Sequence, residues 1–480
     1  MNSLVSIERS REFFPADKLL NISATSSVGD HCTATDTYTD YLRFWQTSPL
    51  QPGHVVVIAL PNTIDVLHMF FAVLNSGLVP ALIAPTTPAE RFGQIIEDFQ
   101  AAALVKSSLR IDGIPHGPGA RAELIGRWSV LIFDAPRMPS TRPGEVIITT
   151  SGTSASFSSG CVHRFESLQA NGLRHAHSIG LRKEDRVLVN LPLYYSTALV
   201  AQAIATLTLD AQLVISGPPF LLPQYTRDIA AHRITVSSLT PVLLRQINAC
   251  EPSGLPPGLR VLSVGGDHVP AEQVQRCLQA NPQLELYLTY GITEAGPRVS
   301  TLAAHRVDPA RYASVGLPLA GTQVRLDWLS ESPWQGELLV SSNTLLLSKI
   351  GRSAKSPLVD IDGTTWLRTG DIFTQDAQGY LFFKGRKSDF LVINDEKVNL
   401  GAIKHICRTL PGVISCRTLV KPTHQALAGF ELEVTLDQSI VPSCDGPSFK
   451  QHILKLLKRY ERPGRIDLVF QDAGSIVNYK

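Results

Sequence analysis

The sequence lacks the features that mark exported, membrane-spanning or strongly charged proteins. Its longest apolar stretches, such as residues 69–74, are far shorter than the ~18 residues that a membrane-spanning helix needs. Glu8, Arg9 and Arg11 stand where a signal peptide would need apolar residues. The 44 Lys and Arg residues nearly balance 42 Asp and Glu residues, so composition gives no field that would attract nucleic acid. We therefore expect a cytoplasmic protein with no membrane span and no nucleic-acid partner.

Cysteine is also scarce. The 480 residues contain seven cysteines, an odd number, scattered without any C-x-x-C spacing. Such a distribution argues against a disulfide framework and against a structural zinc site. The length, with 44% hydrophobic residues and 18% charged residues, instead predicts a globular chain of two to four compact units.

Apolar runs alternate with helical patterns through the first half of the chain. Residues 54–60 and 186–192 have the composition of buried strands, and residues 63–77 and 196–209 have helical periodicity. Strands that alternate with helices of this length predict a mostly parallel sheet with helices on both faces.

The pattern changes from about Val315 onward. Short alternating segments separated by Gly and Asp turns predict a small antiparallel β unit, and helical and strand-like segments after Asp389 predict a small α+β domain. The expected fold class is α/β, with a large N-terminal domain over residues 1–387 and a C-terminal α+β domain over residues 388–480.

Residues 147–160 form the strongest local motif. A β-branched strand runs into a loop composed almost wholly of Ser, Thr and Gly, whose backbone N–H groups and hydroxyls can surround a polyphosphate. The G-x-x-x-x-G-K-[ST] spacing of a P-loop is missing. Taken alone, a Ser/Thr/Gly segment is more often an ordinary surface loop than a phosphate site.

Two further motifs contain groups suited to a nucleotide. Tyr290 beside Gly291 offers a stacking face with backbone clearance, and the Glu294 carboxylate can hold Mg²⁺. Asp371, in a Thr-Gly-Asp turn, can accept both hydroxyls of a ribose, and Arg386 can reach a phosphate or the same sugar. Taken one at a time, these motifs have an ordinary structural interpretation as well: Tyr290 as a buried side chain, and the others as common turns and solvated charges.

The order and spacing of these motifs resemble the adenylate-forming superfamily, which includes acyl- and aryl-CoA ligases, firefly luciferase and the adenylation domains of nonribosomal peptide synthesis. The resemblance covers residues 35–480, and it is supported by the short segments at residues 60–62, 264–267, 315–318 and 336–338. It implies a two-step reaction. A carboxylate attacks the α-phosphate of Mg²⁺-bound ATP to give an acyl-adenylate, and the thiol of CoA or of a carrier protein's phosphopantetheine then takes the acyl group.

The resemblance also implies roles for individual residues. Tyr290 would stack on adenine, Thr293 would contact the α-phosphate and Glu294 would bind Mg²⁺, while Asp389 would be the hinge of a mobile C-terminal lid that rotates when ligand binds. The nucleotide-binding residues would be Thr150, Ser151, Gly152, Thr153, Ser154, Gly266, Asp267, Tyr290, Gly291, Asp371 and Arg386.

Family members use a C-terminal lysine to stabilise the charge that develops during adenylation. In one register Gly474-Ser475 replaces the family's Gly-Lys and the lysine is lost. In the other register, counted from the strand-like residues 466–470, Lys480 takes its place. We favour Lys480 as a catalytic residue, and the first register remains the alternative.

Other positions depart from the family pattern. The phosphate loop ends in Ser-Ser-Gly where the family has Pro-Lys-Gly, so one cation is missing, and His163 or Arg164 could substitute only by moving. Val392 and Asp395 replace a Lys and a Gly on the loop that faces the thiol acceptor, which favours a carrier protein slightly over CoA.

The expected substrate is a small aryl or acyl carboxylic acid. The resemblance places Tyr195 and Gly265 at the substrate, and no carboxylate stands beside Tyr195 to receive the ammonium of an α-amino acid. The expected protein is thus an AMP-forming acid–thiol ligase. An amide-forming ligase of the same superfamily, or a homologue that binds ligands without adenylating, remains the alternative.

Overall fold

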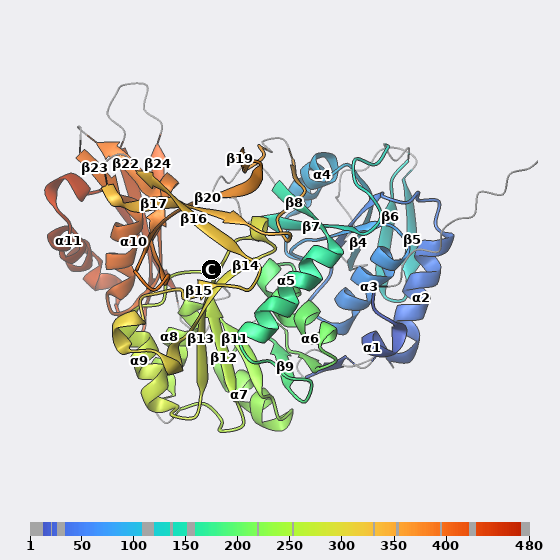
Figure 1. Ribbon diagram of the computed structural model, residues 1–480, viewed down its shortest axis with the longest axis horizontal. Helices are drawn as coiled ribbons and strands as arrows, with labels where there is room; N and C mark the ends of the chain where they lie inside the picture. Colours follow the sequence, from blue (N-terminus) through green and yellow to red (C-terminus); the bar gives the residue numbers. More distant parts are fainter. Residues whose placement is uncertain are drawn as a thin grey trace, which may run out of the picture. The chain divides into compact units, whose positions relative to one another are not determined.

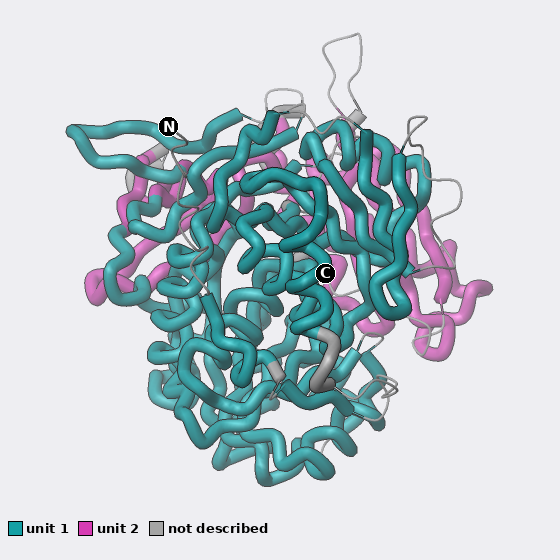
Figure 2. Tube along the Cα trace, turned by 90° about the vertical axis from the view of Figure 1, so that its right-hand side faces the viewer, with its two compact units in different colours: residues 1–323, 340–367 teal, residues 324–339, 368–480 magenta. Residues whose placement is uncertain are grey.

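The computed structural model of the chain describes residues 13–20, 22–25, 34–107, 120–134, 138–150, 159–217, 220–251, 254–329, 332–351, 355–393, 396–421 and 429–471. The chain divides into two compact units, which Figure 2 shows in teal and magenta. Unit 1 consists of residues 1–323 and 340–367, and unit 2 of residues 324–339 and 368–480. The predicted division of function between residues 1–387 and 388–480 stays a prediction.

The first sheet of unit 1 has the strand order β18-β8-β7-β3-β2-β4-β6-β5. Its central strands β7, β3, β2 and β4 run parallel, and antiparallel strands complete both sides. The strands are β2 Val55–Ala59, β3 Val79–Leu82, β4 Ala101–Ser107, β5 Arg121–Ile125, β6 Trp128–Ile132, β7 Glu145–Thr150, β8 Ser159–Arg164 and β18 Ser348–Ile350.

The second sheet of unit 1 has the order β1-β10-β9-β11-β12-β13-β14-β15. It is parallel from β1 to β13 and antiparallel from β13 to β15. The strands are β1 Ser23–Ala24, β9 Arg186–Val189, β10 Gln212–Ile215, β11 Val236–Leu239, β12 Val261–Gly265, β13 Glu285–Gly291, β14 Arg298–Ala303 and β15 Leu317–Pro318.

Helices lie on both sides of this second sheet (Figure 1). Helix α8 packs on β12 and α9 packs on α8, while α5 packs on β14 and α6 on β10. The helices of unit 1 are α1 Ala16–Leu20, α2 Ala34–Thr47, α3 Ile64–Asn75, α4 Ala89–Asp98, α5 Phe165–Ser178, the π-helix η3 Thr197–Ile204, α6 Ala205–Thr208, α7 Leu222–Ala231, α8 Pro241–Cys250 and α9 Ala271–Ala280.

Burial explains why these segments form parallel sheets. All five residues of β2 are buried, as expected for a strand whose two faces are both covered. Helix α3 is buried along almost its whole length, which fits its continuously apolar sequence. A core of Val, Ile, Leu and Phe side chains, including Phe92 and Phe99, surrounds β2 and its neighbours.

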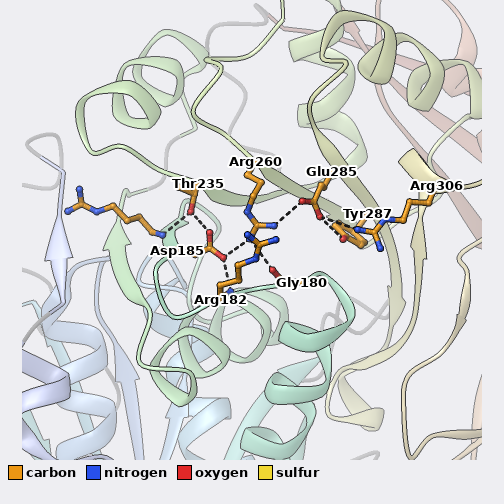
Figure 3. Close-up of polar contacts among 9 residues, drawn as sticks. Gly180, Arg182, Asp185, Thr235, Arg260, Glu285, Tyr287 and Arg306 are labelled. Carbon is orange, nitrogen blue, oxygen red and sulfur yellow. Dashed lines mark hydrogen bonds and ion pairs between the residues drawn. The ribbon is translucent and has the colours of Figure 1, made fainter.

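A polar network joins the strand starts at the amino-terminal edge of the second sheet (Figure 3). Arg260, just before β12, contacts Asp185 at 2.6 Å and Glu285 at 3.1 Å, and it also donates to the Gly180 carbonyl oxygen. Thr235 donates to the other oxygen of Asp185. Because ligands of such sheets bind at the opposite, carboxyl edge, we interpret this network as structural.

Unit 2 contains most of an antiparallel sheet of order β16-β17-β20-β19, with β21 paired to β20, and a sheet of order β24-β25-β26. Helices α10 Leu400–Thr409 and α11 Gly446–Leu456 share a core with the second of these sheets. The first sheet consists of β16 Gln323–Leu329, β17 Ser332–Ser341, β19 Leu358–Ile361, which lies in unit 1, β20 Thr364–Gln375 and β21 Leu381–Arg386. The second consists of β24 Val413–Lys421, β25 Gly429–Asp437 and β26 Arg465–Gln471, and β22 Phe390–Ile393 pairs with β23 Glu396–Asn399.

The predicted fold class is confirmed. Mostly parallel sheets flanked by helices form the large N-terminal part, and antiparallel strands and an α+β segment follow. The mobility of the C-terminal part stays a prediction. Across the described residues, no helix combines the length and the apolar character needed to cross a membrane.

Candidate active site

The carboxyl ends of β12 and β13 bring the second group of motif residues together. The two strands are parallel, and Gly265 at the end of β12 is opposite Thr289 of β13. The chain therefore leaves the sheet at Gly266 and Asp267 on one strand, beside Tyr290 on the next. Ligands of open α/β sheets bind at this edge, so the pairing places the predicted base-binding residues where a nucleotide can reach them.

Close backbone packing explains the glycines at this edge. A Cβ atom on Gly265 would collide with the Thr289 hydroxyl, and one on Gly291 would collide with the Pro297 carbonyl oxygen. Gly266 differs, because it has a φ of +100° and a Cβ atom there would meet nothing within 4 Å. Open space therefore begins next to the tightly packed end of β12.

Thr293 and Glu294 lie on a short 3₁₀ helix, Thr293–Ala295, directly after β13. The buried His163 ring contacts the Thr293 carbonyl oxygen through Nε2 at 3.0 Å, and the Ser196 hydroxyl lies 3.3 Å from the Thr293 hydroxyl. Leu346 donates its backbone N–H to the Glu294 carbonyl oxygen at 2.9 Å. These bonds fix the turn, which carries the Thr293 hydroxyl and the Glu294 carboxylate on adjacent residues.

Lys349 is a cation at this site that the sequence patterns did not indicate. It lies on β18, which pairs with β8, and its ammonium contacts Glu294 Oε1 at 2.7 Å. Burial alone would lower the pKa of Lys349, but the Glu294 carboxylate raises it above its ordinary value. Because Lys349 is 55 residues from Glu294 in sequence, only the pairing of β18 with β8 reveals this contact.

His163 and Arg164 do not take the place of the missing loop lysine. His163 is fully buried, and burial lowers its pKa to about 4, so the ring is neutral at pH 7. Arg164 is exposed at the end of β8. Lys349 is the cation that the described part of the chain brings to Glu294.

Tyr195, the predicted substrate residue, precedes the π-helix η3. Its side chain is only partly exposed, and burial raises the pKa of its hydroxyl above the ordinary value. The ring lies 4.6 Å from the Tyr194 ring between centroids. Since the next residue, Ser196, contacts Thr293, Tyr195 is attached to a segment that reaches the predicted α-phosphate residue.

Asp371 and Arg386, both in unit 2, form an ion pair. They are directly opposite each other on β20 and β21, and Arg386 Nε lies 3.1 Å from Asp371 Oδ1. Asp371 is 1% exposed, whereas the Arg386 side chain is about half exposed. The predicted ribose carboxylate and its neighbouring arginine are therefore together in the fold.

The buried carboxylate of Glu337 organises the Thr-Gly-Asp turn. It accepts the Gly370 backbone N–H at 3.1 Å and forms ion pairs with Arg368 at 2.7 Å and Lys387 at 3.3 Å. Gly370 has a φ of +72°, which a residue without Cβ adopts most easily. Gly370 of the Thr-Gly-Asp turn is thus favoured by its backbone conformation, and its N–H is held by Glu337.

The predicted hinge residue, Asp389, ends the 3₁₀ helix Lys387–Asp389 and forms an ion pair with Lys404 of α10 at 2.9 Å. Its role as a hinge stays a prediction. Thr150 is the last residue of β7, which contacts the 3₁₀ helix of Glu294. The remaining predicted residues, Ser151, Gly152, Thr153, Ser154, Asp395 and Lys480, lie outside the described residues.

The oxygen groups of Thr293 and Glu294 fit Mg²⁺. No group of three or more His, Cys, Asp or Glu residues that could enclose a metal ion occurs in the described ranges. A nucleotide-associated Mg²⁺ needs only one or two protein carboxylates, because phosphates and water supply the other ligands. Glu294 meets that requirement.

Comparison with known proteins agrees with this fold. The family model described as "AMP-binding enzyme" matches residues 46–348. A sulfoacetate–CoA ligase from Cupriavidus necator is 27% identical over 88% of this chain and 85% of its own. A 2-succinylbenzoate–CoA ligase from Bacillus cytotoxicus is 23% identical over 78% of this chain and 76% of its own. The solved o-succinylbenzoate CoA synthetase from Bacillus subtilis in complex with AMP superimposes with a TM-score of 0.74, at 18% identity, over 94% and 92% of the two chains.

Fold, motif order and family match define an adenylate-forming enzyme. The chain belongs to the AMP-binding enzyme family. The predicted class, an AMP-forming acid–thiol ligase, is confirmed by the family match and these relatives.

Proposed function

We propose that the protein uses ATP to activate an aryl or acyl carboxylic acid and transfers the acyl group to CoA. The main structural support is the shared edge of β12 and β13, where Gly266, Asp267 and Tyr290 lie close to the turn of Thr293 and Glu294. CoA is the acceptor named in the relatives compared above, and this outweighs the slight preference for a carrier protein that Val392 and Asp395 suggested.

The chemistry requires two anions to meet. In the first step a carboxylate oxygen bonds to the α-phosphorus, the bond from that phosphorus to the bridging oxygen breaks, and pyrophosphate leaves with the electron pair. In the second step the deprotonated thiol sulfur attacks the acyl carbon, and AMP leaves. Positive charge and hydrogen-bond donors must therefore be fixed in place before the substrates arrive.

The described residues of unit 1 supply several of these groups. The Thr293 hydroxyl can donate to an α-phosphate oxygen, and its contact with Ser196 orients it. Mg²⁺, when held by Glu294, supplies positive charge next to the phosphates. Lys349 lies against the same carboxylate and supplies a second positive charge. Tyr290 offers its ring to the adenine.

In unit 2, the paired Asp371 and Arg386 are the proposed ribose contacts. Buried Asp371 can accept hydrogen bonds, and the neighbouring Arg386 orients this carboxylate. Lys480 remains the proposed catalytic lysine of the first step. Asp389 remains the proposed hinge.

The direct test is carboxylate-dependent exchange of labelled pyrophosphate into ATP. The panel should contain sulfoacetate, 2-succinylbenzoate, a long-chain fatty acid and α-amino acids, with formation of the CoA thioester measured in parallel. We expect exchange with an aryl or acyl acid and none with α-amino acids. Replacing Thr293 with Val should reduce exchange by about 100-fold, since one fixed donor to the reacting phosphate is lost.

Two results would contradict the proposal. Measurable ATP binding without exchange for any acid would indicate a homologue that no longer adenylates. Exchange without thioester formation from CoA would show that a different acceptor completes the reaction.

A further inference from the structure

Arg298 is a buried cation next to the predicted substrate residues. It begins β14 and is 3% exposed. Its Nη1 donates to the Thr289 hydroxyl at 2.8 Å, and its backbone N–H donates to the Asn171 side-chain oxygen at 2.8 Å. These bonds fix both the backbone and one edge of the guanidinium.

The charge of Arg298 has no ion-pair partner within the described ranges. The structure gives it no contact with a carboxylate there, and its buried Nε has no hydrogen-bond partner in the same ranges. Burial lowers the pKa of Arg298 to about 10, so the side chain is still a cation at pH 7. A buried charge without a counter-charge is unfavourable, so such a group usually has a ligand or another charge as its partner.

The position of Arg298 indicates which part of a ligand would meet it. Its Nη1 lies 3.0 Å from where a Cβ atom of Gly265 would be, and Gly265 is the residue predicted to contact the carboxylic acid substrate. Open space begins at the next residue, Gly266. Lys349, by contrast, lies at Glu294, the residue proposed for Mg²⁺ and phosphates. The two cations therefore have different neighbours.

A second polar group lies within electrostatic reach of Arg298. His175 of α5 is fully buried, and neither ring nitrogen has a hydrogen-bond partner among the residues that the structure describes. Burial, followed by the charge of Arg298, lowers the pKa of His175 well below its ordinary value. The neutral ring keeps one N–H that can donate to an anionic oxygen.

We propose that Arg298, with His175 within electrostatic reach, binds a second acidic group on the substrate, so that the protein activates carboxylic acids bearing another carboxylate or a sulfonate. This inference rests on the proposed function. Arg298 is a specificity residue in this assignment, and the reacting carboxylate is a different group of the same molecule. A planar guanidinium suits such an oxygen pair because it can donate two parallel hydrogen bonds.

The test compares acids that differ only in the second acidic group. Suitable pairs are 2-succinylbenzoate with 4-oxo-4-phenylbutanoate, and succinate with succinamate. We expect the wild type to prefer the diacid of at least one pair by about 100-fold in kcat/KM for pyrophosphate exchange, since a site built for a polar group rejects an analogue without it. Arg298→Met should remove that preference, because kcat/KM should fall far more for the diacid than for the matched monoacid.

Two further variants separate specificity from structure. Arg298→Lys keeps the charge and should keep a reduced preference for the diacid. Thr289→Val removes the hydroxyl that orients one edge of the guanidinium but keeps the cation, so it should reduce the preference less than Arg298→Met does. ATP binding, measured by calorimetry, reports on folding in every variant, and Arg298→Gln replaces Arg298→Met if the latter does not fold.

The outcomes distinguish this inference from the proposed function. The inference is overturned if Arg298→Met and Arg298→Gln lose equal activity with the diacid and the monoacid. It is also overturned if the wild type prefers the monoacid in both pairs. Neither result affects the ligase proposal. If no acid supports exchange, the ligase proposal fails. Calorimetric binding of diacid and monoacid then still tests Arg298, and equal affinity for the two would overturn its assignment.

Discussion

At the residue scale, Lys349 is the cation that the described part of the chain brings to Glu294. The ammonium contacts Glu294 at 2.7 Å, so it holds positive charge beside the proposed metal ligand. Glu294 would hold Mg²⁺, which would supply positive charge to the phosphates, and Lys349 would add a second cation beside the same carboxylate. Lys349 can then serve the nucleotide in place of the lysine that the Ser/Thr/Gly loop lacks.

We predict that Lys349→Met weakens binding of a non-hydrolysable ATP analogue in the presence of Mg²⁺ by about tenfold, the usual effect of losing one charge-assisted hydrogen bond. Lys349→Arg, which keeps the charge, is the matched control and should lose much less. Isothermal titration calorimetry at fixed Mg²⁺ measures both. An unchanged Kd for Lys349→Met would show that the ion pair is only structural.

At the scale of secondary-structure elements, Glu337 of β17 connects neighbouring segments of unit 2. Its buried carboxylate meets Arg368 and Lys387 and accepts the Gly370 N–H. Removing it leaves two cations and a backbone donor with fewer partners. We predict that Glu337→Ala lowers the free energy of unfolding by about 2 kcal/mol.

Asp327 supplies a matched control for this prediction. It is the other carboxylate on Arg368, at 2.8 Å, but its side chain is 44% exposed. An exposed pair of this kind contributes about 0–1 kcal/mol, so Asp327→Ala should be nearly neutral. Chemical denaturation with a probe in unit 2 compares the two variants. Equal losses would contradict the assignment of Glu337 as the organising residue.

The strand starts of the second sheet form another test at this scale. Arg260 lies between Asp185, which is almost buried, and Glu285 (Figure 3). Arg260→Met should destabilise the protein by about 3 kcal/mol because it leaves Asp185 without its cation. ATP binding by the folded fraction should not change, since the network is at the edge opposite Tyr290. A large fall in ATP affinity at full folding would show that this network acts on the site.

At the scale of the whole molecule, buried histidines make stability depend on pH. Burial lowers the pKa of His68 and of His175 below 6.5 in the folded protein. The unfolded chain therefore binds more protons below about pH 6.5, so stability is full above that pH and falls as the pH drops. His68 also bonds the Leu19 carbonyl oxygen at 2.9 Å.

We predict that His68→Gln, which can keep this donor without titrating, flattens the fall in thermal stability between pH 7 and pH 5. The measurement is the unfolding temperature of wild type and variant across that range. The variant should lose less on acidification even if it is less stable at pH 7. Parallel curves would contradict a role for His68 in the pH dependence.

Local patterns in the sequence were sufficient for the fold class and for many of the motif residues. Buried parallel strands have continuous apolar runs, as in β2, and helices have their own periodicity, so both can be recognised in a short window. The tight glycines at 265 and 291 likewise belong to short motifs. The roles that the resemblance implies for Tyr290, Glu294, Asp371 and Arg386 stay predictions, although the structure shows how each is held.

Only the tertiary structure showed which charges have partners. Lys349 meets Glu294 because β18 pairs with β8, and nothing in the residues around Lys349 indicates that pairing. Arg298 stands four residues after Glu294 in sequence, yet its burial and its proximity to Gly265 depend on how β12, β13 and β14 pair. Periodicity and motifs are properties of neighbouring residues, whereas desolvation and ion pairing depend on segments that folding brings together from distant parts of the chain.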